Sequence, residues 1–159
     1  MPAFTLLNTT VLAGTAWTGT APGGTAAPSG TITTPSDLSP YVTSVDLGQE
    51  IATNESTTFG AGGFVTRLTG LQSASIGLTF NQDFGASLLD SILWTTLGGI
   101  GASIFLDVKA TSAARSATNP SFVYQAIITE LMPITGSVGD TAEFSVNWEI
   151  TGRFGRLTA

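Results

Sequence analysis

The sequence predicts a mainly β protein: a β-sandwich or barrel of two packed sheets, with one flanking α-helix from about Gly85 to Leu97 and long loops. Three observations lead to this fold class. Apolar and polar residues alternate with a period of two in several segments, which is the pattern of half-buried strands. Apolar residues recur at helical spacing, every three or four positions, in only one segment. The 159 residues, 42% of them hydrophobic, suit a single domain with one core, spanning residues 1–159.

The chain is expected to begin with an extended segment and a long arm. Residues 4–12 are β-branched or apolar, which favours a strand. Residues 14–36 are rich in Thr, Gly and Pro, so we expect an arm that is mobile unless a neighbouring molecule packs on it. Trp17 lies within this arm. It either tethers the arm to the protein's own surface, which is the simpler interpretation, or anchors a partner.

Two strands are expected in the middle of the chain, separated by a long loop. Residues 41–47 alternate, with Tyr41, Thr43, Val45 and Leu47 on one face. Residues 48–63 are polar and glycine-rich and are expected to form a loop. Residues 71–80 alternate more regularly, with four residues predicted to point inward: Ala74, Ile76, Leu78 and Phe80.

The single helix and three further strands follow. Apolar residues at helical spacing define the helix, Asp83 or Ser87 can cap its start, and Gly98 suits its end. Trp94 lies outside the apolar arc and is expected to be partly exposed. The strands are expected at residues 104–109, at 122–131, which is apolar on both faces, and at 142–150, which alternates strictly; a small-residue loop spans 110–120.

Composition argues against several classes of function. The chain has no Cys and no His, which removes the common nucleophile, general base and zinc ligands, so we expect no enzyme activity, no cofactor and no metal. The net charge of -6 disfavours a protein that grips nucleic acid. The most hydrophobic stretch, residues 86–106, contains Asp90 and several glycines, so membrane insertion is not expected. The N-terminus does not have the pattern of a secretory signal, which favours synthesis and use in a cytoplasm.

The order of several short motifs carries a family resemblance. These motifs are residues 37–45 (DLSPYVTSV), residues 57–60 (TTFG), the amphipathic helix with Trp94, Asn119-Pro120 before a strand, and residues 136–140 (GSVGD) before the last strand. In this order, over about residues 37–152, the chain resembles the tail tube (major tail) proteins of long-tailed bacteriophages. It departs from them in the long insertion at residues 14–34.

The resemblance implies a β-sandwich with a flanking helix, six copies in a ring, and rings stacked into a tube through which the genome passes. It implies that the chain's partners are further copies of itself together with tape-measure, tail terminator and distal tail proteins, and that double-stranded DNA passes without specific binding. The expected location is the virion, in the phage tail, after assembly in the host cytoplasm. The low positive charge agrees, because a wall of carboxylates and hydroxyls repels phosphates.

Two sets of candidate site residues follow from these expectations. The polar face of the last strand and its neighbours is the candidate lumen surface: Glu143, Ser145, Asn147, Glu149, Asp46 and Thr79. An ordinary solvated outer face is the alternative for these residues. The loops and off-core aromatics give the candidate contacts between subunits or rings: Thr57, Phe59, Phe64, Trp94, Arg115, Asn119 and Trp17.

Two alternative functions remain open on the sequence alone. Another virion component, such as a tail terminator, a neck protein or a decoration protein, is also small, acidic and free of catalytic groups. A carbohydrate-binding β-sandwich would stack Trp17, Trp94 or Trp148 on sugar rings.

Overall fold

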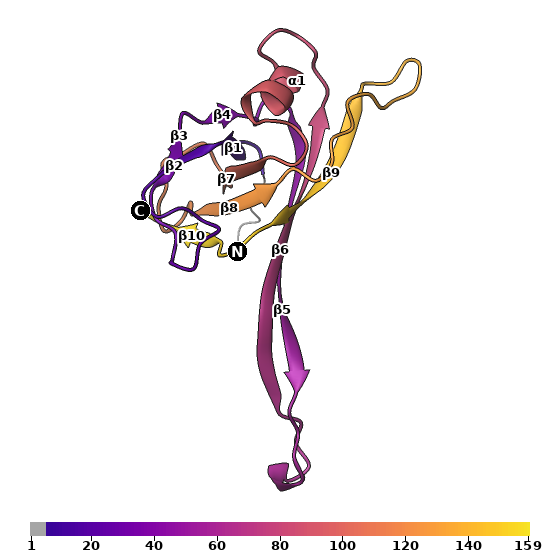
Figure 1. Ribbon diagram of the computed structural model, residues 1–159. Coiled ribbons are helices and arrows are strands. Elements are labelled where there is room, and N and C mark those ends of the chain that lie inside the picture. The colour runs from indigo at the N-terminus through magenta and orange to yellow at the C-terminus, as the bar shows by residue number, and fades with distance from the viewer. Residues whose placement is uncertain (1–5) are drawn as a thin grey trace.

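A computed structural model describes residues 6–159, and the first residues of the predicted strand at 4–12 lie outside this range. The fold is a β-sandwich with one short helical segment, as the sequence predicted (Figure 1). Its elements are β1 (Thr10–Gly14), β2 (Ala16–Thr18), β3 (Thr31–Thr33), β4 (Ser36–Asp37), β5 (Val42–Glu55), η1 (Phe59–Ala61), β6 (Arg67–Asn81), α1 (Leu89–Ser91), η2 (Ile92–Thr96), β7 (Ser103–Lys109), β8 (Ser121–Ile127), β9 (Glu143–Ile150) and β10 (Gly155–Leu157).

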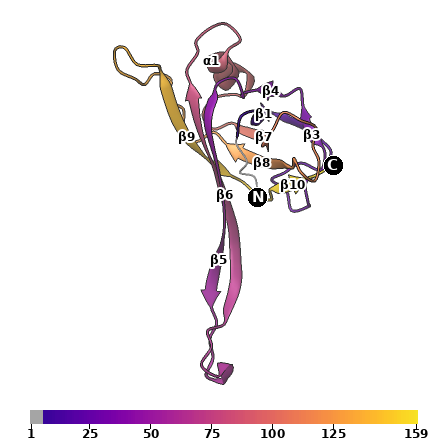
Figure 2. The ribbon, with the colours of Figure 1, turned by 180° about the vertical axis from the view of Figure 1, so that it is seen from behind.

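The two layers of the sandwich meet at β8. The hydrogen-bonded strand order is β4-β1-β7-β8-β9-β6-β5, with β10 paired to β8 outside this path. β8 pairs with β9 at only two positions, Ala126 and Ile127, whereas its first three residues pair with β10. One layer is therefore β9-β6-β5, and the other is β4-β1-β7-β8 with β10. Figures 1 and 2 show the long strands of the first layer beside the smaller second layer.

The core lies between the layers and under the helical segment. The four predicted inward residues of β6 are all buried, and β9 alternates strictly between buried and exposed. Phe80 stacks on Phe144 with ring centroids 5.2 Å apart and lies 6.2 Å from the fully buried Trp148. Burying side chains of this size contributes about 2–3 kcal/mol each, so this aromatic cluster fixes β6 against β9.

The loop predicted at residues 48–63 is mostly strand. β5 continues to Glu55 and pairs with β6 back to Arg67, so only the tip between them lacks ladder pairing. Thr43 does not share a face with Val45 and Leu47, although the alternation predicted that it would. A register shift between Val42 and Ser44 leaves Thr43 exposed, while Val45 and Leu47 are partly buried. A bulge of this kind inserts one residue and turns the side chains beside it.

The helix is shorter than the predicted 85–97. Ser87 has a φ of 63°, outside the right-handed helical region, so the helix begins only after it, at α1. No side chain caps α1, and the Asp83 carboxylate instead accepts the Gly85 N–H. The segment continues as the π-helical turn η2, and Gly98, with a φ of 94°, ends it as expected.

Three other segments differ from the prediction. β8 ends at Ile127 rather than at 131, although it is buried or half-buried along its whole length as its two-sided apolar pattern indicated. The arm at 14–36 contains the β2-β3 hairpin and β4 instead of being structureless. β10 had no sequence signal, because it has only three residues and no alternation.

Candidate assembly surfaces

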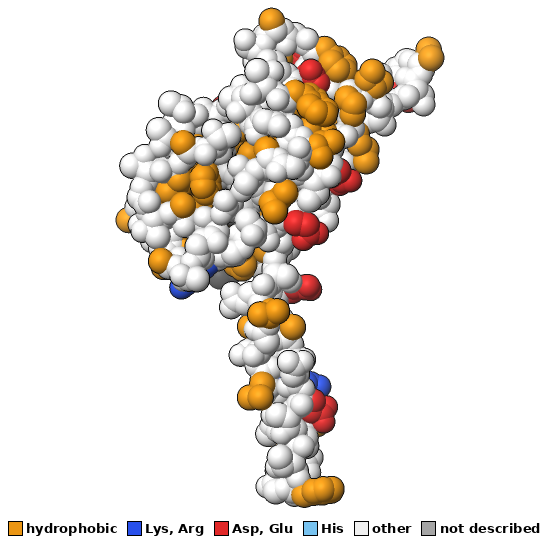
Figure 3. Space-filling view, in the orientation of Figure 1, with side chains coloured by type: hydrophobic (Ala, Val, Ile, Leu, Met, Phe, Trp, Pro, Cys, Tyr) orange, Lys and Arg blue, Asp and Glu red, His pale blue; other side chains and the backbone are white. Residues whose placement is uncertain are grey.

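The six candidate lumen residues lie on one face of the β9-β6-β5 layer. Register pairs Thr79 with Ser145 and Gly77 with both Asn147 and Asp46, while Glu143 and Glu149 occupy the same face of β9. This face points away from the core, and Figure 3 shows acidic side chains along it. The structure therefore brings together residues that are up to 103 positions apart in the chain. Whether the face lines a lumen stays a prediction.

Hydrogen bonds order this polar face. The hydroxyls of Thr79 and Ser145 lie 2.8 Å apart, and Thr43 donates to the Glu143 carboxylate at 2.8 Å. Ser73 donates to Glu50 at 3.0 Å, which adds a carboxylate that the sequence analysis did not select. Within residues 6–159 the one ion pair is Arg115–Asp107, so no cation of the described chain neutralises these carboxylates. The face therefore carries hydrogen-bonded hydroxyl groups together with carboxylates that form no ion pair within the described residues.

The β5-β6 hairpin extends beyond the sandwich as a stalk, which we define as residues 49–72. None of its residues is buried. It carries six exposed large hydrophobic residues: Ile51, Phe59, Phe64, Val65, Leu68 and Leu71. In Figure 3 the charged side chains lie on one side of the stalk, and the hydrophobic ones lie at its front and opposite side and, at the tip, on the charged side as well. The stalk is thus amphipathic with no core of its own.

The tip of the stalk has a defined turn but does not bury its aromatic residues. Thr57 accepts the Thr66 N–H at 3.2 Å, so this candidate contact residue braces the turn. Gly62 and Gly63 have φ angles of 61° and 86°, which other residues rarely adopt. Phe59 and Phe64 are exposed, Phe59 fully. Exposed apolar side chains of this size often mark interaction surfaces; a contact of Phe59 and Phe64 with another subunit or ring stays a prediction.

The helical segment and the loop before β9 lie at the opposite end of the molecule from the stalk tip (Figure 1). The helical segment, the loops beside it and the loop before β9 carry a second set of exposed large apolar residues, the apical residues: Phe84, Trp94, Ile100, Met132, Ile134 and Val138. Trp94 is 43% exposed, as expected, and its ring covers Gly99, where a Cβ would stand 2.9 Å from Trp94 Cε3. Apart from Leu6 and Leu7, the exposed large hydrophobic residues of the described chain therefore belong to the stalk or to the apical set.

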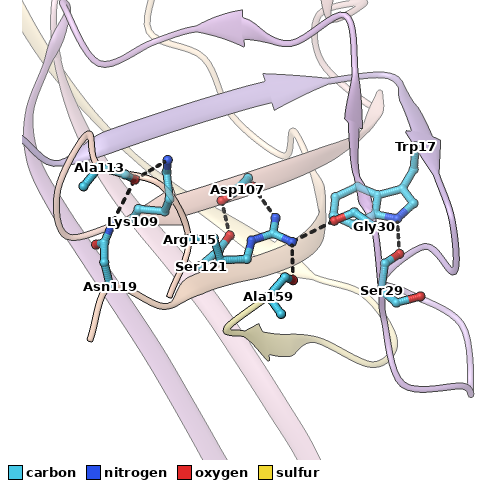
Figure 4. A network of polar contacts seen from close by, with 10 residues as sticks. All are labelled: Trp17, Ser29, Gly30, Asp107, Lys109, Ala113, Arg115, Asn119, Ser121 and Ala159. Atoms are coloured by element: carbon cyan, nitrogen blue, oxygen red, sulfur yellow. Dashed lines mark hydrogen bonds and ion pairs between the residues drawn. The ribbon is translucent and has the colours of Figure 1, made fainter. Parts of the chain in front are cut away.

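Arg115 and Asn119 are used within their own chain. Arg115 donates to Asp107 at 3.1 Å and to the carbonyls of Gly30 and Ala159 at 3.0 and 3.3 Å (Figure 4). Asp107 is buried and also accepts a hydrogen bond from Ser121. Asn119 is buried and donates to the Ala113 carbonyl at 2.9 Å. These bonds order the loop at 110–120; a role between subunits stays a prediction.

Trp17 attaches the arm to the sandwich. Its indole N–H donates to the Ser29 carbonyl at 2.9 Å, and its ring lies 5.7 Å from Phe105 (Figure 4). Arg153 adds a second attachment, because it donates to the Thr25 carbonyl at 3.2 Å and its own carbonyl accepts the Gly23 N–H at 2.7 Å. The arm therefore packs on its own chain, which is the simpler of the two interpretations of Trp17.

Cations gather on the arm side of the molecule and hold backbone carbonyls there. Lys109, Arg115, Arg153 and Arg156 each donate to a carbonyl of a small-residue loop. The fifth cation, Arg67, is on the stalk. The sequence analysis missed this pattern because the cations are scattered along the chain, and only the fold places their targets near them.

Tyr124 connects the base of the stalk to the sandwich. Its hydroxyl accepts a hydrogen bond from Gln49 at 2.7 Å, and its ring lies 5.8 Å from Phe154. Burial raises the pKa of the Tyr124 hydroxyl above its usual value, and the hydrogen bond from Gln49 partly offsets this by lowering it. Sequence reasoning missed this contact because Gln49 lies in the segment expected to be a loop.

Other kinds of site have little support within residues 6–159. No helix in this range is long and apolar enough to cross a bilayer. No group of His, Cys, Asp or Glu residues in the same range is arranged to hold a metal ion. Trp148, one of the three candidates for stacking on a sugar ring, is fully buried, whereas Trp94 is 43% exposed.

Comparison with known proteins gives a likeness in fold. No family model matches the sequence, and no curated protein is similar to it. Seven chains of solved structures match. One belongs to the virion of a native gene transfer agent particle, with a TM-score of 0.54 and 16% sequence identity, over 77% of this chain and 88% of that chain. At this identity the likeness shows a shared fold, here with a chain of a virion particle.

Proposed function

We propose that the chain is a structural virion protein that assembles into hexameric rings, which stack as the tail tube of a bacteriophage and conduct the genome into the host. The exposed apolar stalk carries this proposal. A monomer has no use for a hairpin that holds six solvated large hydrophobic residues, because such patches cost solubility. Burying even half of them contributes on the order of 5–9 kcal/mol, which is enough to drive association.

The positions of the apolar surfaces favour stacking over a closed dimer. The stalk tip and the apical residues lie at opposite ends of the molecule (Figure 1). A contact between two different surfaces is heterologous, so it leaves both outer ends open for another copy. A stalk from one ring that reaches the apical residues of the next would produce a growing tube.

Unpaired strand edges favour lateral assembly into rings. β5 is the last strand of its layer, and its outer edge is unpaired over 14 residues. A long unpaired edge is a template for pairing with another chain. Pairing around a closed ring would satisfy this edge in every copy. The number six comes from the resemblance to tail tube proteins.

The polar face suits a wall along which DNA moves. Asp46, Glu50, Glu143 and Glu149 are on the same face as a row of hydroxyls. Carboxylates repel phosphates, and hydroxyls do not retain them, so DNA would pass without specific binding. The arm side, with its cations, would then form the outer surface. Tape-measure, terminator and distal tail proteins remain the expected partners at the ends of the tube.

Sedimentation combined with negative-stain microscopy of the purified protein tests the proposal. We expect rings of six copies that lengthen into tubes as the concentration rises. A strictly monomeric species at all concentrations would refute assembly. Rings that never stack would instead favour a terminator, neck or decoration protein, which is the alternative that shares most of these surface features.

A further inference from the structure

The outer edge of β9 is closed by side chains rather than by a strand. β8 pairs with β9 at Ala126–Ile150 and Ile127–Glu149 and then leaves the ladder. Continuing this antiparallel register by two residues places Thr129 opposite Asn147. At that position, however, the Glu130 carboxylate accepts the Asn147 N–H at 2.7 Å, and the Thr129 hydroxyl donates to the Asn147 carbonyl at 3.2 Å.

The segment that supplies these side chains has free main-chain donors. Within residues 6–159, none of the N–H groups of residues 129–132 donates a hydrogen bond. The Glu130 carbonyl accepts the Trp148 indole N–H at 3.0 Å, which keeps the segment beside β9. Met132 is 43% exposed at its end, and Pro133, which lacks an N–H, follows. The segment is an interrupted continuation of β8.

β5 of a second copy fits this segment in direction, and its 14 residues are more than enough to cover it. β5 is antiparallel to β6, β6 to β9, and β9 to β8, so β5 runs antiparallel to the continuation of β8. Rotational symmetry keeps strand directions along the ring axis unchanged. The free edge of β5 in one copy therefore meets residues 129–132 of its neighbour in the antiparallel orientation. β4, at the other end of the strand order, has only two residues and is too short for this role.

We propose that residues 129–132 are the lateral docking edge for β5 of a second copy, and that Glu130 keeps this edge closed in the free protomer. On docking, the Asn147 N–H passes from the Glu130 carboxylate to the Thr129 main-chain carbonyl, and the segment becomes a strand between β9 and the neighbour's β5. This inference rests on the proposed ring. It adds that the Glu130 carboxylate, which takes the place of a strand's main-chain carbonyl, slows the first lateral contact between two copies.

Glu130→Ala and Glu130→Gln form a matched pair of variants. The Ala variant removes the acceptor, whereas the Gln variant removes the charge and keeps an oxygen. In the free protomer, we expect the Asn147 amide to exchange with deuterium about tenfold faster or more in Glu130→Ala, the usual effect of losing one hydrogen bond to a charged acceptor. The lag before tube growth, measured by light scattering, should shorten by a similar factor. Glu130→Gln, which keeps a neutral acceptor, should fall between the wild type and Glu130→Ala in both measurements.

The two measurements separate this inference from the proposed function. Unchanged exchange at Asn147 in Glu130→Ala would show that the carboxylate is no cap, and an unchanged or longer lag would show that it does not restrain docking; either result overturns the inference. If the wild type forms no rings or tubes at any concentration, the proposed function fails, while the exchange measurement still reports on the cap.

Discussion

The stalk and the arm differ in the way each segment becomes ordered. Both are rich in small polar residues, and the sequence analysis expected loops in both. The arm is held by its own chain, through Trp17 on Phe105 and through Arg115 and Arg153 on its carbonyls. The stalk has ladder hydrogen bonds but no buried side chain. Such a segment packs within the protomer when other parts of the fold supply side chains that contact it. Where they do not, as in the stalk, only another molecule can cover its apolar side chains.

The largest expected effect comes from making the stalk tip polar. Phe59→Ser combined with Phe64→Ser removes two aromatic side chains that are largely exposed in the protomer. If they are buried on assembly, at about 2 kcal/mol each, the concentration needed for tube formation should rise about a hundredfold or more. The melting temperature of the protomer should not change.

Trp17→Ala is the control for this pair, because Trp17 packs on its own chain. It should lower the melting temperature and leave assembly intact below that temperature. A stalk variant that melts earlier, or that assembles at the wild-type concentration, would remove the distinction between the two regions.

Arg115→Ala should give the next largest effect, and it acts on the arm side. It leaves the buried Asp107 carboxylate without its cation, which typically costs about 3 kcal/mol of unfolding free energy. Chemical denaturation measures this loss. Adding Asp107→Asn should recover part of the stability, because it removes the uncompensated charge. A double variant that is less stable than Arg115→Ala would contradict this explanation.

The same geometry bears on the loop at 110–120. Deleting residues 111–118 removes Arg115 together with its ion pair to Asp107. We therefore expect the deletion to destabilise the protomer as well as to stop tube growth. Circular dichroism melting curves of the deletion variant, compared with those of Arg115→Ala, measure how much of the loss belongs to the ion pair.

The polar face and the arm side also differ in charge. Reversing the charge of the polar face should have a smaller effect, and this effect should depend on salt. Glu143→Lys with Glu149→Lys places cations among the hydroxyls of this face, whose carboxylates form no ion pair within the described residues. Tubes should still form but should retain DNA, and the retention should weaken as salt rises. Cosedimentation with linear DNA measures it, and normal genome ejection from tails with both changes would reject the lumen assignment. Lysines on the arm side, at Thr18 and Thr31, are the control and should retain no DNA inside the tube.

The smallest effect concerns the junction between stalk and sandwich. Tyr124→Phe removes the hydrogen bond from Gln49 and should cost about 1 kcal/mol. Because burial raises the pKa of Tyr124, the hydroxyl stabilises the fold below about pH 10, the value in an unfolded chain, and this contribution is lost as the pH rises through the folded value. Tyr124→Phe should therefore lose less stability than the wild type above pH ~10. Equal losses in both proteins would contradict this.

Alternation was the most reliable signal in the sequence. It identified the buried face of β6 and of β9, because each strand has one side on the core and the other in solvent. The lumen candidates followed from the same alternation, and the register of β6 with β9 and β5 brought them together. Their common face was thus predictable, although their function was not.

The remaining features depend on contacts that no local pattern encodes. The stalk was missed because both of its faces are exposed, so residues 48–55 lack the apolar side that marks a strand. The helix start was misplaced because the positive φ of Ser87 depends on its surroundings and not on its residue type. Arg115 was selected as a contact residue, but its targets at Asp107, Gly30 and Ala159 appear only in the fold.

The antiparallel ladder of the stalk also sets how the protein would respond to mechanical load. Its two strands are anchored in the sandwich and joined by the turn at the tip, so a pull along the stalk is carried by two covalent backbones in parallel. A sideways force at the tip would instead bend this two-stranded ribbon, which takes far less force. The register shift between Ile51 and Thr53 interrupts the ladder and is the point where bending concentrates. A shaft built from such hairpins would be stiff along its length and compliant across it.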